Sequence, residues 1–433
     1  MRKNTIDIIT MGCSKNLVDS ERLMRQFAAN GYRVNHDPEQ PEGEIVVINT
    51  CGFTGEAKKE SVEMILQFTQ ARKEQKIKQL LVMGCLSERY RDDLKTFIPE
   101  VDRFYGKFDW KQLLADLGKP YHPELANERL LTTPAHYAYL KIAEGCNRTC
   151  AYCSIPLMTG PYQSRTIEDI ETEVRSLVKR GVKELQLIAQ DLTYYGKDLY
   201  KQYNLAGLLQ RISDIEGVEW IRLHYAYPAH FPLDILPVMR TRDNICKYLD
   251  IALQHSSDRI LQRMRRNITR RETIDLLKTI REEVPGIHLR TTFMVGFPGE
   301  TAGEFAGLLD FVREMRFERL GAFTYSEEEG TYSAQHYPDR IGIKTKQQRL
   351  DELMRIQEGI AAETNEAKTG QTLKVIIDRE ESGFYIGRTE YDSPEVDPEV
   401  LIEKSEPLTV GNFYPIRITG TQAYDLLGKL LTT

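Results

Sequence analysis

Short apolar runs that alternate with amphipathic stretches constrain the fold of this chain more than any other feature. In the first third of the sequence, apolar runs at 5–11, 44–50 and 79–84 each precede a segment with helical periodicity. Strands that alternate with helices build βαβ units, and such units form a parallel sheet. The sequence therefore predicts an N-terminal α/β domain over residues 1–120.

The same alternation resumes after a proline-containing linker at 121–136 and continues for six strand–helix units. The helical segments begin at typical caps, such as Thr166 and Thr301. Six consecutive units predict a partial (β/α)6 barrel of the TIM type over residues 137–367. The strand-like runs are AYLKIAEGC (138–146), ELQLIAQD (184–191), WIRLHYAYP (220–228), YLDIALQH (248–255), HLRTTFMVGFP (288–298) and RLGAFTYS (319–326).

The composition changes again near residue 368, where short strand-like runs replace the helices. TLKVIID (372–378), FYIGRTE (384–390) and FYPIRITG (413–420) are separated by turn residues. Regular short strands of this kind predict a small β-barrel or sandwich over residues 368–433.

Charge and cysteine content limit the classes of protein to which the chain can belong. The net charge is −6, which provides no global attraction to nucleic acid or anionic lipid. Asp7 interrupts any signal-peptide core, and no apolar run reaches the length of a membrane span. We therefore expect a cytoplasmic protein with no membrane partner, in which seven reduced cysteines favour metal or redox chemistry over disulfides.

Three cysteines, Cys13, Cys51 and Cys85, each follow one of the N-terminal apolar runs and precede a helical segment. The carboxyl ends of parallel strands lie at one edge of a sheet, and open α/β sheets bind ligands at that edge. Any one of these cysteines could be a small residue that fills a strand-to-helix turn. Because all three occupy equivalent positions, we expect them to converge on one site.

Three further cysteines, Cys146, Cys150 and Cys153, follow the first strand of the predicted barrel with the spacing C-x3-C-x2-C. Structural zinc needs four N or S ligands, and no second cysteine pair or nearby histidine completes the set. Haem attachment requires C-x-x-C-H, whereas Ser154 follows the last cysteine. Iron–sulfur clusters are normally held by four thiolates, so three cysteines leave one iron open to a substrate or cofactor. The spacing favours such an open cluster.

The C-x3-C-x2-C spacing, with the aromatic Tyr152 before the last cysteine, resembles the signature of the radical S-adenosylmethionine (SAM) superfamily. The resemblance implies a [4Fe–4S] cluster whose open iron is chelated by the amino and carboxylate groups of SAM. In that superfamily the reduced cluster passes an electron to the sulfonium, and a 5′-deoxyadenosyl radical then abstracts a hydrogen atom. The cofactors carry the difficult chemistry, and the protein supplies binding and orientation.

Further candidate cofactor-binding residues lie at the ends of other predicted barrel strands. Gln190 and Asp191 end the second strand and His255 ends the fourth, where side chains commonly line the barrel mouth. Each could equally be a satisfied polar strand end. The loop after the fifth strand looks like the superfamily loop that approaches the cofactor, although a Gly/Pro loop is also an ordinary turn. This loop consists of Gly296, Phe297, Pro298, Gly299 and Glu300.

Taken together, the two cysteine triads and the order of domains resemble the radical SAM methylthiotransferases along essentially the whole chain. The resemblance implies a second [4Fe–4S] cluster on the N-terminal triad, a C-terminal TRAM domain, two molecules of SAM, an electron donor and a sulfur source. One SAM methylates sulfur on the N-terminal cluster and the other makes the radical. The motifs that carry the resemblance are GC-K at Cys13, NTC-F at Cys51, GC at Cys85, GC-R-C-YC-IP, WIR--Y-YP and LQHSSDRIL-RMRR.

The charge of the C-terminal segment bears on the substrate, because family members act on transfer RNA or on a protein. Residues 366–433 contain seven Lys or Arg and twelve Asp or Glu, a net charge of −5. This charge is unfavourable for an RNA backbone and suits a basic partner. The stretch GRTEYDSPEVD (387–397) also resembles the RimO branch, which modifies the β-carbon of an aspartate in small-subunit ribosomal protein twelve. The same stretch could be a solvated acidic loop, a docking surface or both.

Two alternatives remain open from the sequence. A transfer-RNA methylthiotransferase, which modifies adenosine, would share the cysteines but should have a basic tail. A non-catalytic, metal-stabilised module that binds RNA or ribosomes would hold zinc and need no cofactor. The sequence favours the ribosomal-protein methylthiotransferase.

Overall fold

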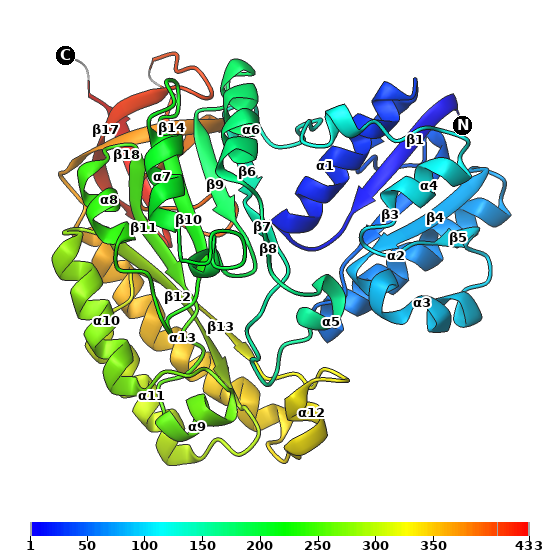
Figure 1. Ribbon diagram of the computed structural model, residues 1–433. Coiled ribbons are helices and arrows are strands. Elements are labelled where there is room, and N and C mark those ends of the chain that lie inside the picture. The colour runs from blue at the N-terminus through cyan, green and yellow to red at the C-terminus, as the bar shows by residue number, and fades with distance from the viewer. Residues whose placement is uncertain (1, 405, 432–433) are drawn as a thin grey trace.

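The computed structural model describes residues 2–404 and 406–431, and its three large sheets follow one another along the chain (Figure 1). A parallel α/β sheet comes first, a second parallel sheet follows, and a closed β-barrel ends the chain. The predicted fold class is confirmed in all three parts.

The N-terminal domain is a five-stranded parallel sheet with helices on both faces. Apolar side chains of α1 and α4 cover one face, and those of α2 and α3 cover the other. The strand order β2-β1-β3-β4-β5 reverses between β1 and β3, and sheets of this type bind ligands at that reversal. The elements are β1 (Arg2–Thr10), α1 (Ser14–Ala29), β2 (Arg33–His36), β3 (Gly43–Thr50), α2 (Gly55–Lys73), β4 (Gln79–Gly84), α3 (Cys85–Phe97), β5 (Arg103–Phe104) and α4 (Trp110–Asp116).

The central domain is a six-stranded parallel sheet in the order β13-β12-β11-β10-β9-β6. Within the described ranges its edge strands β6 and β13 do not pair with each other, so the barrel stays open. Helices cover its outer side (Figure 1). The strands of this sheet are β6 (Tyr137–Lys141), β9 (Glu184–Ile188), β10 (Trp220–Ala226), β11 (Ile245–Ile251), β12 (His288–Val295) and β13 (Arg319–Thr324). The short strands β7 (Ala143–Glu144) and β8 (Gln163–Ser164) pair with each other in a separate antiparallel sheet. The helices are α5 (Pro156–Thr159), α6 (Ile167–Lys179), α7 (Leu205–Ser213), α8 (Ile235–Thr241), α9 (Asp258–Arg263), α10 (Arg270–Glu283), α11 (Ala302–Met315), α12 (Tyr332–His336) and α13 (Ile343–Glu366), with 3-10 turns η1 (Pro123–Leu125) and η2 (Leu192–Tyr194).

The predicted caps begin their helices as expected. The Thr166 hydroxyl accepts the backbone N–H of Asp169 at the start of α6. Thr301 and Glu304 form a reciprocal capping box at the start of α11. Such side chains satisfy backbone donors that have no partner within the helix, which explains where both helices start.

The segment 121–136 is anchored to both neighbouring domains by a buried arginine. Arg129 lies 3.1 Å from Glu21 of α1 and 3.0 Å from Glu173 of α6, and all three side chains are at most 2% exposed. The Glu21 carboxylate also accepts the backbone N–H of Thr132. Because a buried charge is costly unless it is paired, these contacts hold the two domains in a fixed relation.

The C-terminal domain is a closed barrel in the order β14-β15-β16-β18-β17, which resolves the expectation of a barrel or a sandwich. Its apolar interior is formed by residues from all five strands. The strands are β14 (Thr372–Glu381), β15 (Phe384–Thr389), β16 (Val400–Glu403), β17 (Phe413–Gln422) and β18 (Asp425–Leu430).

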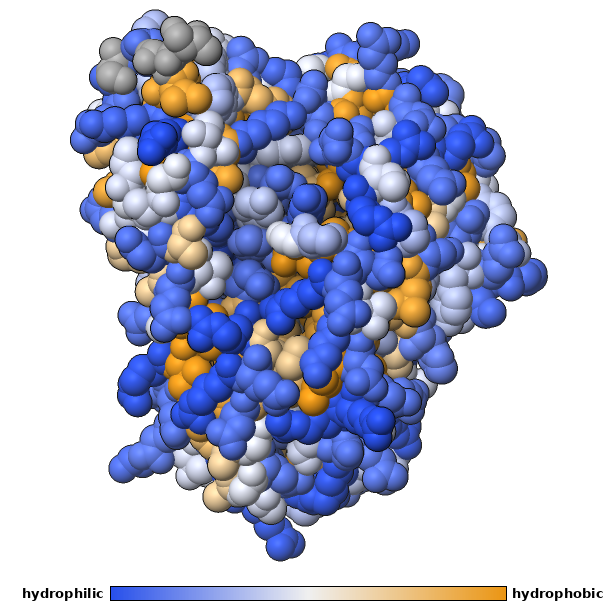
Figure 2. Space-filling model, turned by 90° about the vertical axis from the view of Figure 1, so that its left-hand side faces the viewer, coloured by the Kyte–Doolittle hydropathy of each residue, from blue (hydrophilic) through white to orange (hydrophobic). Residues whose placement is uncertain are grey.

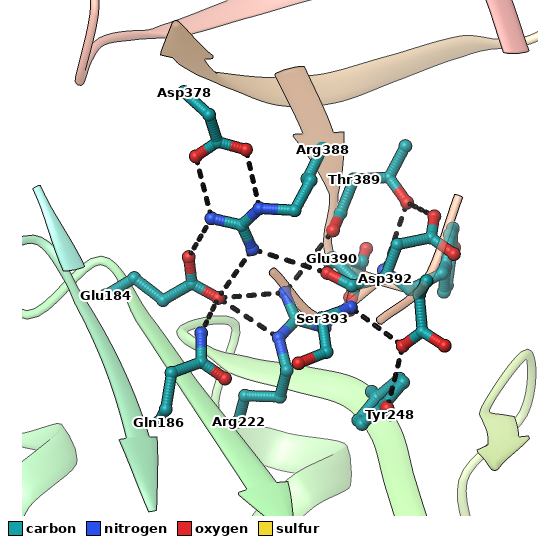
Figure 3. A network of polar contacts seen from close by, with 12 residues as sticks. Glu184, Gln186, Arg222, Tyr248, Asp378, Arg388, Thr389, Glu390, Asp392 and Ser393 are labelled. Atoms are coloured by element: carbon teal, nitrogen blue, oxygen red, sulfur yellow. Dashed lines mark hydrogen bonds and ion pairs between the residues drawn. The ribbon is translucent and has the colours of Figure 1, made fainter. Parts of the chain in front are cut away.

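A buried ionic network joins this small barrel to the amino ends of the central strands (Figure 3). Glu184, at the start of β9, lies 2.8 Å from Arg388 of β15 and 3.0 Å from Arg222 of β10. Arg388 also pairs with Asp378 of β14 at 2.6 Å. All of these side chains except Asp378 are at most 1% exposed.

The acidic stretch 387–397 lies mostly inside this junction, so the expectation of a solvated acidic loop is wrong for most of its length. Residues 387–389 and 392–394 are buried, whereas Glu395 and Val396 are exposed. Asp392 pairs with Arg319 at 2.6 Å, and Asp397 accepts the hydroxyl of Tyr248 at 2.8 Å. The carboxylates are buried because arginine and tyrosine side chains of the central strands compensate them.

The face shown in Figure 2 is mostly hydrophilic, and its hydrophobic side chains form separate patches. Among the helices of the described residues, none is long and apolar enough to cross a membrane.

Candidate functional site

The loops that carry Cys13, Cys51 and Cys85 interlock at the carboxyl edge of the N-terminal sheet. Cys13 and Cys51 follow β1 and β3, the two strands at which the strand order reverses. A Cβ atom on Gly12 would lie 2.7 Å from Cys51 Sγ, and one on Gly52 would lie 2.8 Å from the backbone nitrogen of Leu86. Only glycine permits this approach, and Gly12 also has a positive φ of 88°. The three cysteine loops therefore lie against one another at this edge, and the role of their thiols as metal ligands stays a prediction.

Asn16, at the start of α1, ties these loops together. Its amide donates to the carbonyls of Met11 and Thr50, at 3.0 and 2.9 Å, and its oxygen accepts the Cys85 thiol at 3.7 Å. Because Asn16 is 1% exposed, the orientation of the Cys85 side chain is fixed from the protein side.

Cys146, Cys150 and Cys153 share a single loop between β7 and α5. Gly145 adopts a positive φ of 78°, and a Cβ there would lie 2.1 Å from the carbonyl oxygen of Pro161. The N–H of Cys153 donates to the carbonyl of Cys150 at 3.1 Å. The loop is therefore folded back on itself so that its three thiols lie at the carboxyl end of the central sheet.

The two cysteine loops face each other across the domain interface. The hydroxyl of Ser154 donates to the carbonyl of Phe53 at 3.5 Å, which joins the residue after Cys153 to the loop after Cys51. Helix α5 also packs against α3, as Figure 1 shows. The two triads are separate in sequence, and the loops that carry them meet at the interface between the two domains.

The same domain interface contains a buried ionic cluster of Asp19, Lys107, Lys141 and Glu144. Lys107 lies 2.9 Å from Glu144 and 3.7 Å from Asp19, and Lys141 lies 2.7 Å from Glu144. Lys141 also contacts Asp19. Burial disfavours the ammonium of Lys107, but Asp19 and Glu144 outweigh it and raise its pKa. The cluster therefore keeps Lys107 charged close to Cys85.

Burial changes the acid–base chemistry of the thiols. It raises the pKa of Cys85 to about 12 and that of Cys146 to about 11, and it also raises the pKa of Cys51. At neutral pH these thiols keep their protons unless a metal cation replaces them. The donor set is therefore suited to a bound metal and not to a free nucleophilic thiolate.

The arrangement of the thiols fits clusters better than single ions. Across residues 2–404 and 406–431, no three His, Cys, Asp or Glu side chains converge closely enough to share one metal ion. In an iron–sulfur cluster each thiolate binds a separate iron atom. Neighbouring thiols that are too far apart to bind one ion can therefore still bind one cluster. A structural zinc site would need convergent tetrahedral ligands.

Two of the predicted strand-end residues, Gln190 and Asp191, lie beside these thiols but already have protein partners. The Gln190 amide donates to Glu144 at 2.9 Å, and its oxygen is buried with no partner in the described structure. Asp191 accepts Nε of Arg148 at 2.7 Å and the N–H of Thr193 at 2.9 Å. Asp191 therefore fixes Arg148 within the C-x3-C loop.

His255 and Glu300 pair with each other inside the protein. The N–H of Ser257 donates to Nδ1 of His255 at 2.9 Å, so the ring proton lies on Nε2, which donates to Glu300 at 3.0 Å. Glu300 also accepts the N–H of Gly296 at 2.6 Å. These contacts fix the conformation of the 296–300 loop, and we expect His255 and Glu300 to position this loop.

The rest of the 296–300 loop lies beside the segment that carries Cys146, Cys150 and Cys153. Phe297 is fully buried and lies edge-on to Tyr152, with ring centroids 6.5 Å apart. Pro298 is buried and Gly299 is exposed with a φ of 89°. The loop and the C-x3-C-x2-C segment are thus in contact, as the predicted site requires.

Sequence reasoning did not assign three charged residues of the site: Lys107, Arg148 and Arg266. Arg148 and Arg266 lie within the motifs GC-R-C-YC-IP and RMRR, which gave no role for either side chain. Lys107 follows the two-residue strand β5 and carries no pattern that could have identified it.

Family comparisons match each of the three domains. Residues 140–312 match the radical SAM superfamily, residues 5–106 match the uncharacterized protein family UPF0004, and residues 369–431 match the TRAM domain. Radical SAM membership implies SAM and one [4Fe–4S] cluster.

Solved structures show the same fold at low sequence identity. The radical SAM methyltransferase TsrM from Kitasatospora setae is 12% identical with a TM-score of 0.55, over 77% of this chain and 74% of TsrM. The cobalamin-dependent radical enzyme OxsB is 13% identical with a TM-score of 0.52, over 82% of this chain and 56% of OxsB.

Much closer relatives share the whole chain. The ribosomal protein uS12 methylthiotransferase RimO of Parabacteroides distasonis is 64% identical over 100% of both chains. RimO of Porphyromonas gingivalis strain ATCC 33277 is 63% identical, also over 100% of both chains. RimO of Cytophaga hutchinsonii is 50% identical over 99% of this chain and 98% of its own. With identity of this level from end to end, the chain belongs to the radical SAM methylthiotransferases of the RimO family.

Proposed function

We propose that this methylthiotransferase inserts a methylthio group at the β-carbon of an aspartate in ribosomal protein uS12, using two [4Fe–4S] clusters. The observation that carries the proposal is that the loops of the two cysteine triads meet at one domain interface. Insertion of sulfur at carbon needs a radical source and a separate sulfur reservoir, and a site with two triads provides a place for each. The β-hydrogen of an ionised aspartate is poorly acidic, so a radical route suits this carbon.

The residues divide between the two proposed clusters. Cys146, Cys150 and Cys153 would hold the radical SAM cluster, and Cys13, Cys51 and Cys85 would hold the second one. When bound, the clusters and SAM supply the electron, the hydrogen abstraction and the sulfur that no side chain can supply.

The protein supplies position and a dry environment. Arg148 lies in the loop between the first two cysteines of the radical triad and is fixed by Asp191 and by the ring of Tyr227, whose centroid is 4.1 Å from its guanidinium carbon. Its Nη2 is buried without a protein partner in the described ranges. We infer that this N–H is available to a carboxylate at the barrel mouth. Tyr152, Gln190, Asp191, His255 and the loop 296–300 are the proposed surroundings of SAM.

The names of the full-length relatives support uS12 as the substrate. The acidic tail adds less support than its sequence suggests, because Asp392 and Asp397 lie in the internal junction. A transfer-RNA substrate is not favoured. The proposal requires an electron donor and a sulfur source, and it places the reaction in the cytoplasm, where the thiols stay reduced.

The test compares cysteine variants after anaerobic reconstitution with iron and sulfide. Cys150→Ala should lose one cluster and all reductive cleavage of SAM. Cys51→Ala should lose the other cluster and all sulfur transfer, yet still release 5′-deoxyadenosine. Cys246→Ala is the matched control, because this buried thiol at the start of β11 lies outside both triads and should leave both clusters intact.

Mass spectrometry of two candidate substrates tests the other half of the proposal. The reconstituted enzyme is incubated separately with uS12 and with transfer RNA, and a mass increase of one methylthio group is sought. Modified RNA together with unmodified uS12 would overturn the assignment of uS12 as the substrate. Iron and sulfide for a single cluster in the parent protein would overturn the assignment of the N-terminal triad.

A further inference from the structure

A buried arginine, Arg266, contacts one of the proposed cluster ligands. Its Nη1 lies 3.4 Å from Cys150 Sγ and 3.5 Å from the hydroxyl of Tyr152. Its Nη2 donates to the carbonyl of Ala252, and the whole residue is 3% exposed. The guanidinium is therefore a permanent positive charge next to a ligand sulfur and away from water.

The surrounding structure fixes Arg266 in this place. Its guanidinium carbon lies 4.1 Å from the ring centroid of Tyr227, and the Tyr227 hydroxyl donates to the Arg266 carbonyl at 2.9 Å. The backbone N–H of Ala151, next to Cys150, donates to the carbonyl of Met264 at 2.9 Å. The turn after α9 and the cysteine loop are thus hydrogen-bonded to each other, and the contact with Cys150 depends on no flexible segment.

We propose that Arg266 raises the reduction potential of the cluster on Cys146, Cys150 and Cys153. Hydrogen bonds to cluster sulfurs and local charge are among the factors that set such potentials. The reduced cluster carries one more negative charge than the oxidised cluster, so a buried cation next to a ligand sulfur stabilises the reduced state more. Arg266 is a positioning residue that acts through Cys150, and the inference rests on the proposed cluster ligands.

A purely structural role for Arg266 is the competing explanation, because its bond to Ala252 alone would help to hold the turn. That role predicts effects on folding and on cluster content. It predicts no change in the potential of a cluster that still assembles. The potential therefore separates the two roles.

The experiment is a redox titration of the full chain in a background that holds a single cluster. Cys13, Cys51 and Cys85 are replaced by alanine, so that only the radical SAM cluster is titrated. Dithionite is oxidised, the cluster gains one electron, and electron paramagnetic resonance counts the reduced cluster at each potential. Iron and sulfide analysis verifies that each variant holds one cluster.

Arg266→Met should make reduction at least about tenfold less favourable, a shift of about 59 mV to lower potential for a one-electron couple. Arg265→Met is the matched control. The Arg265 guanidinium stacks on Tyr332, 3.3 Å from its ring centroid, and the potential should stay unchanged. Arg266→Lys keeps the charge but replaces the two donor nitrogens Nη1 and Nη2 with a single one, so a smaller shift in the same direction is expected.

An unchanged potential in Arg266→Met, with cluster content intact, would overturn the proposal. If Arg266→Met fails to assemble a cluster, Arg266→Gln decides, because it removes the charge but keeps a polar side chain: a lowered potential supports the proposal and a parental potential refutes it. Absence of any cluster in the parent background would instead refute the proposed ligands, so the two failures are distinguishable.

Discussion

Removal of one arginine from the junction between the small β-barrel and the central sheet should loosen that junction measurably. The substitution is Arg388→Met, which keeps an unbranched side chain of similar length but removes the charge. Arg388 lies 2.8 Å from Glu184 and 2.6 Å from Asp378, and its side chain is 1% exposed. The variant therefore leaves both carboxylates without this partner, Glu184 in a fully buried position and Asp378 in a mostly buried one.

The size of the effect follows from the charges that remain. Around Arg388, the parent junction places Glu184 between the guanidiniums of Arg388 and Arg222, and Asp378 pairs with Arg388, as Figure 3 shows. Loss of one partner from a buried pair costs about 3–5 kcal/mol. Glu184 keeps Arg222 at 3.0 Å, and Asp378 keeps His136 at 2.8 Å, so we expect the lower end, about 3 kcal/mol.

Tryptophan fluorescence provides a local assay. Of the two tryptophans, Trp220 is 2% exposed, and its ring centroid lies 4.7 Å from that of Phe413 in β17. In a Trp110→Phe background the remaining signal comes from Trp220, on the junction itself. Urea titration should show the transition reported by Trp220 at a lower urea concentration in the Arg388→Met variant, with a free energy of unfolding lower by about 3 kcal/mol.

An exposed ion pair serves as the matched control. Arg211 binds Glu171 through two contacts of 2.8 Å, but the arginine side chain is 55% exposed. Arg211→Met should cost about 1 kcal/mol or less. If Arg388→Met costs no more than this control, the buried network does not hold the barrel in place and the reasoning is refuted.

Two further predictions concern the cysteine loops and a buried lysine. Gly12→Ala should lose the iron of one cluster, because its new Cβ would clash with Cys51. Gly31→Ala is the control and should keep both clusters, since Gly31 has a similar positive φ but no atom within 4 Å of such a Cβ. Iron and sulfide analysis after reconstitution distinguishes the two variants, and a full iron content in Gly12→Ala would contradict the packing argument. Burial lowers the pKa of Lys368 from 10.5 to about 8, so between these pH values the unfolded chain holds a proton that the folded chain lacks, and the parent should gain stability as pH rises. Urea unfolding across this range should show that Lys368→Met lacks this gain, and an identical pH dependence in both proteins would show that the lysine is not desolvated.

The parts of the fold that were predictable from the sequence are those with a long local pattern. The apolar strands at 5–11 and 44–50 and the caps Thr166 and Thr301 each follow from a few neighbouring residues. The strands β2 and β5 carried too little pattern to be found, because β2 has four residues and β5 has two. In the small barrel, β16 and β18 depend on pairing with each other across more than twenty residues of sequence, which no local pattern indicates.

The candidate site was predictable only where the topology of the sheet determines the position of a residue. Parallel strands deliver their carboxyl ends to one edge, so the convergence of the Cys13, Cys51 and Cys85 loops follows from fold class alone. No such rule places Lys107 beside Glu144, since the contact joins two domains and neither residue has a characteristic neighbour. Arg266 likewise contacts Cys150 across 116 positions of sequence. Contacts of this kind require the assembled structure.

The same limitation affects inference from net charge. The C-terminal segment is acidic by count, but Asp378, Asp392 and Asp397 face inward and pair with arginine side chains there. Two of these arginines, Arg319 and Arg290, belong to the central strands, so the count for the segment omits their compensating charge. Docking of a basic protein depends on the charge that faces solvent. The exposed acidic surface of the small barrel is therefore weaker than the sequence indicates, and the charge count alone is weak support for a basic partner.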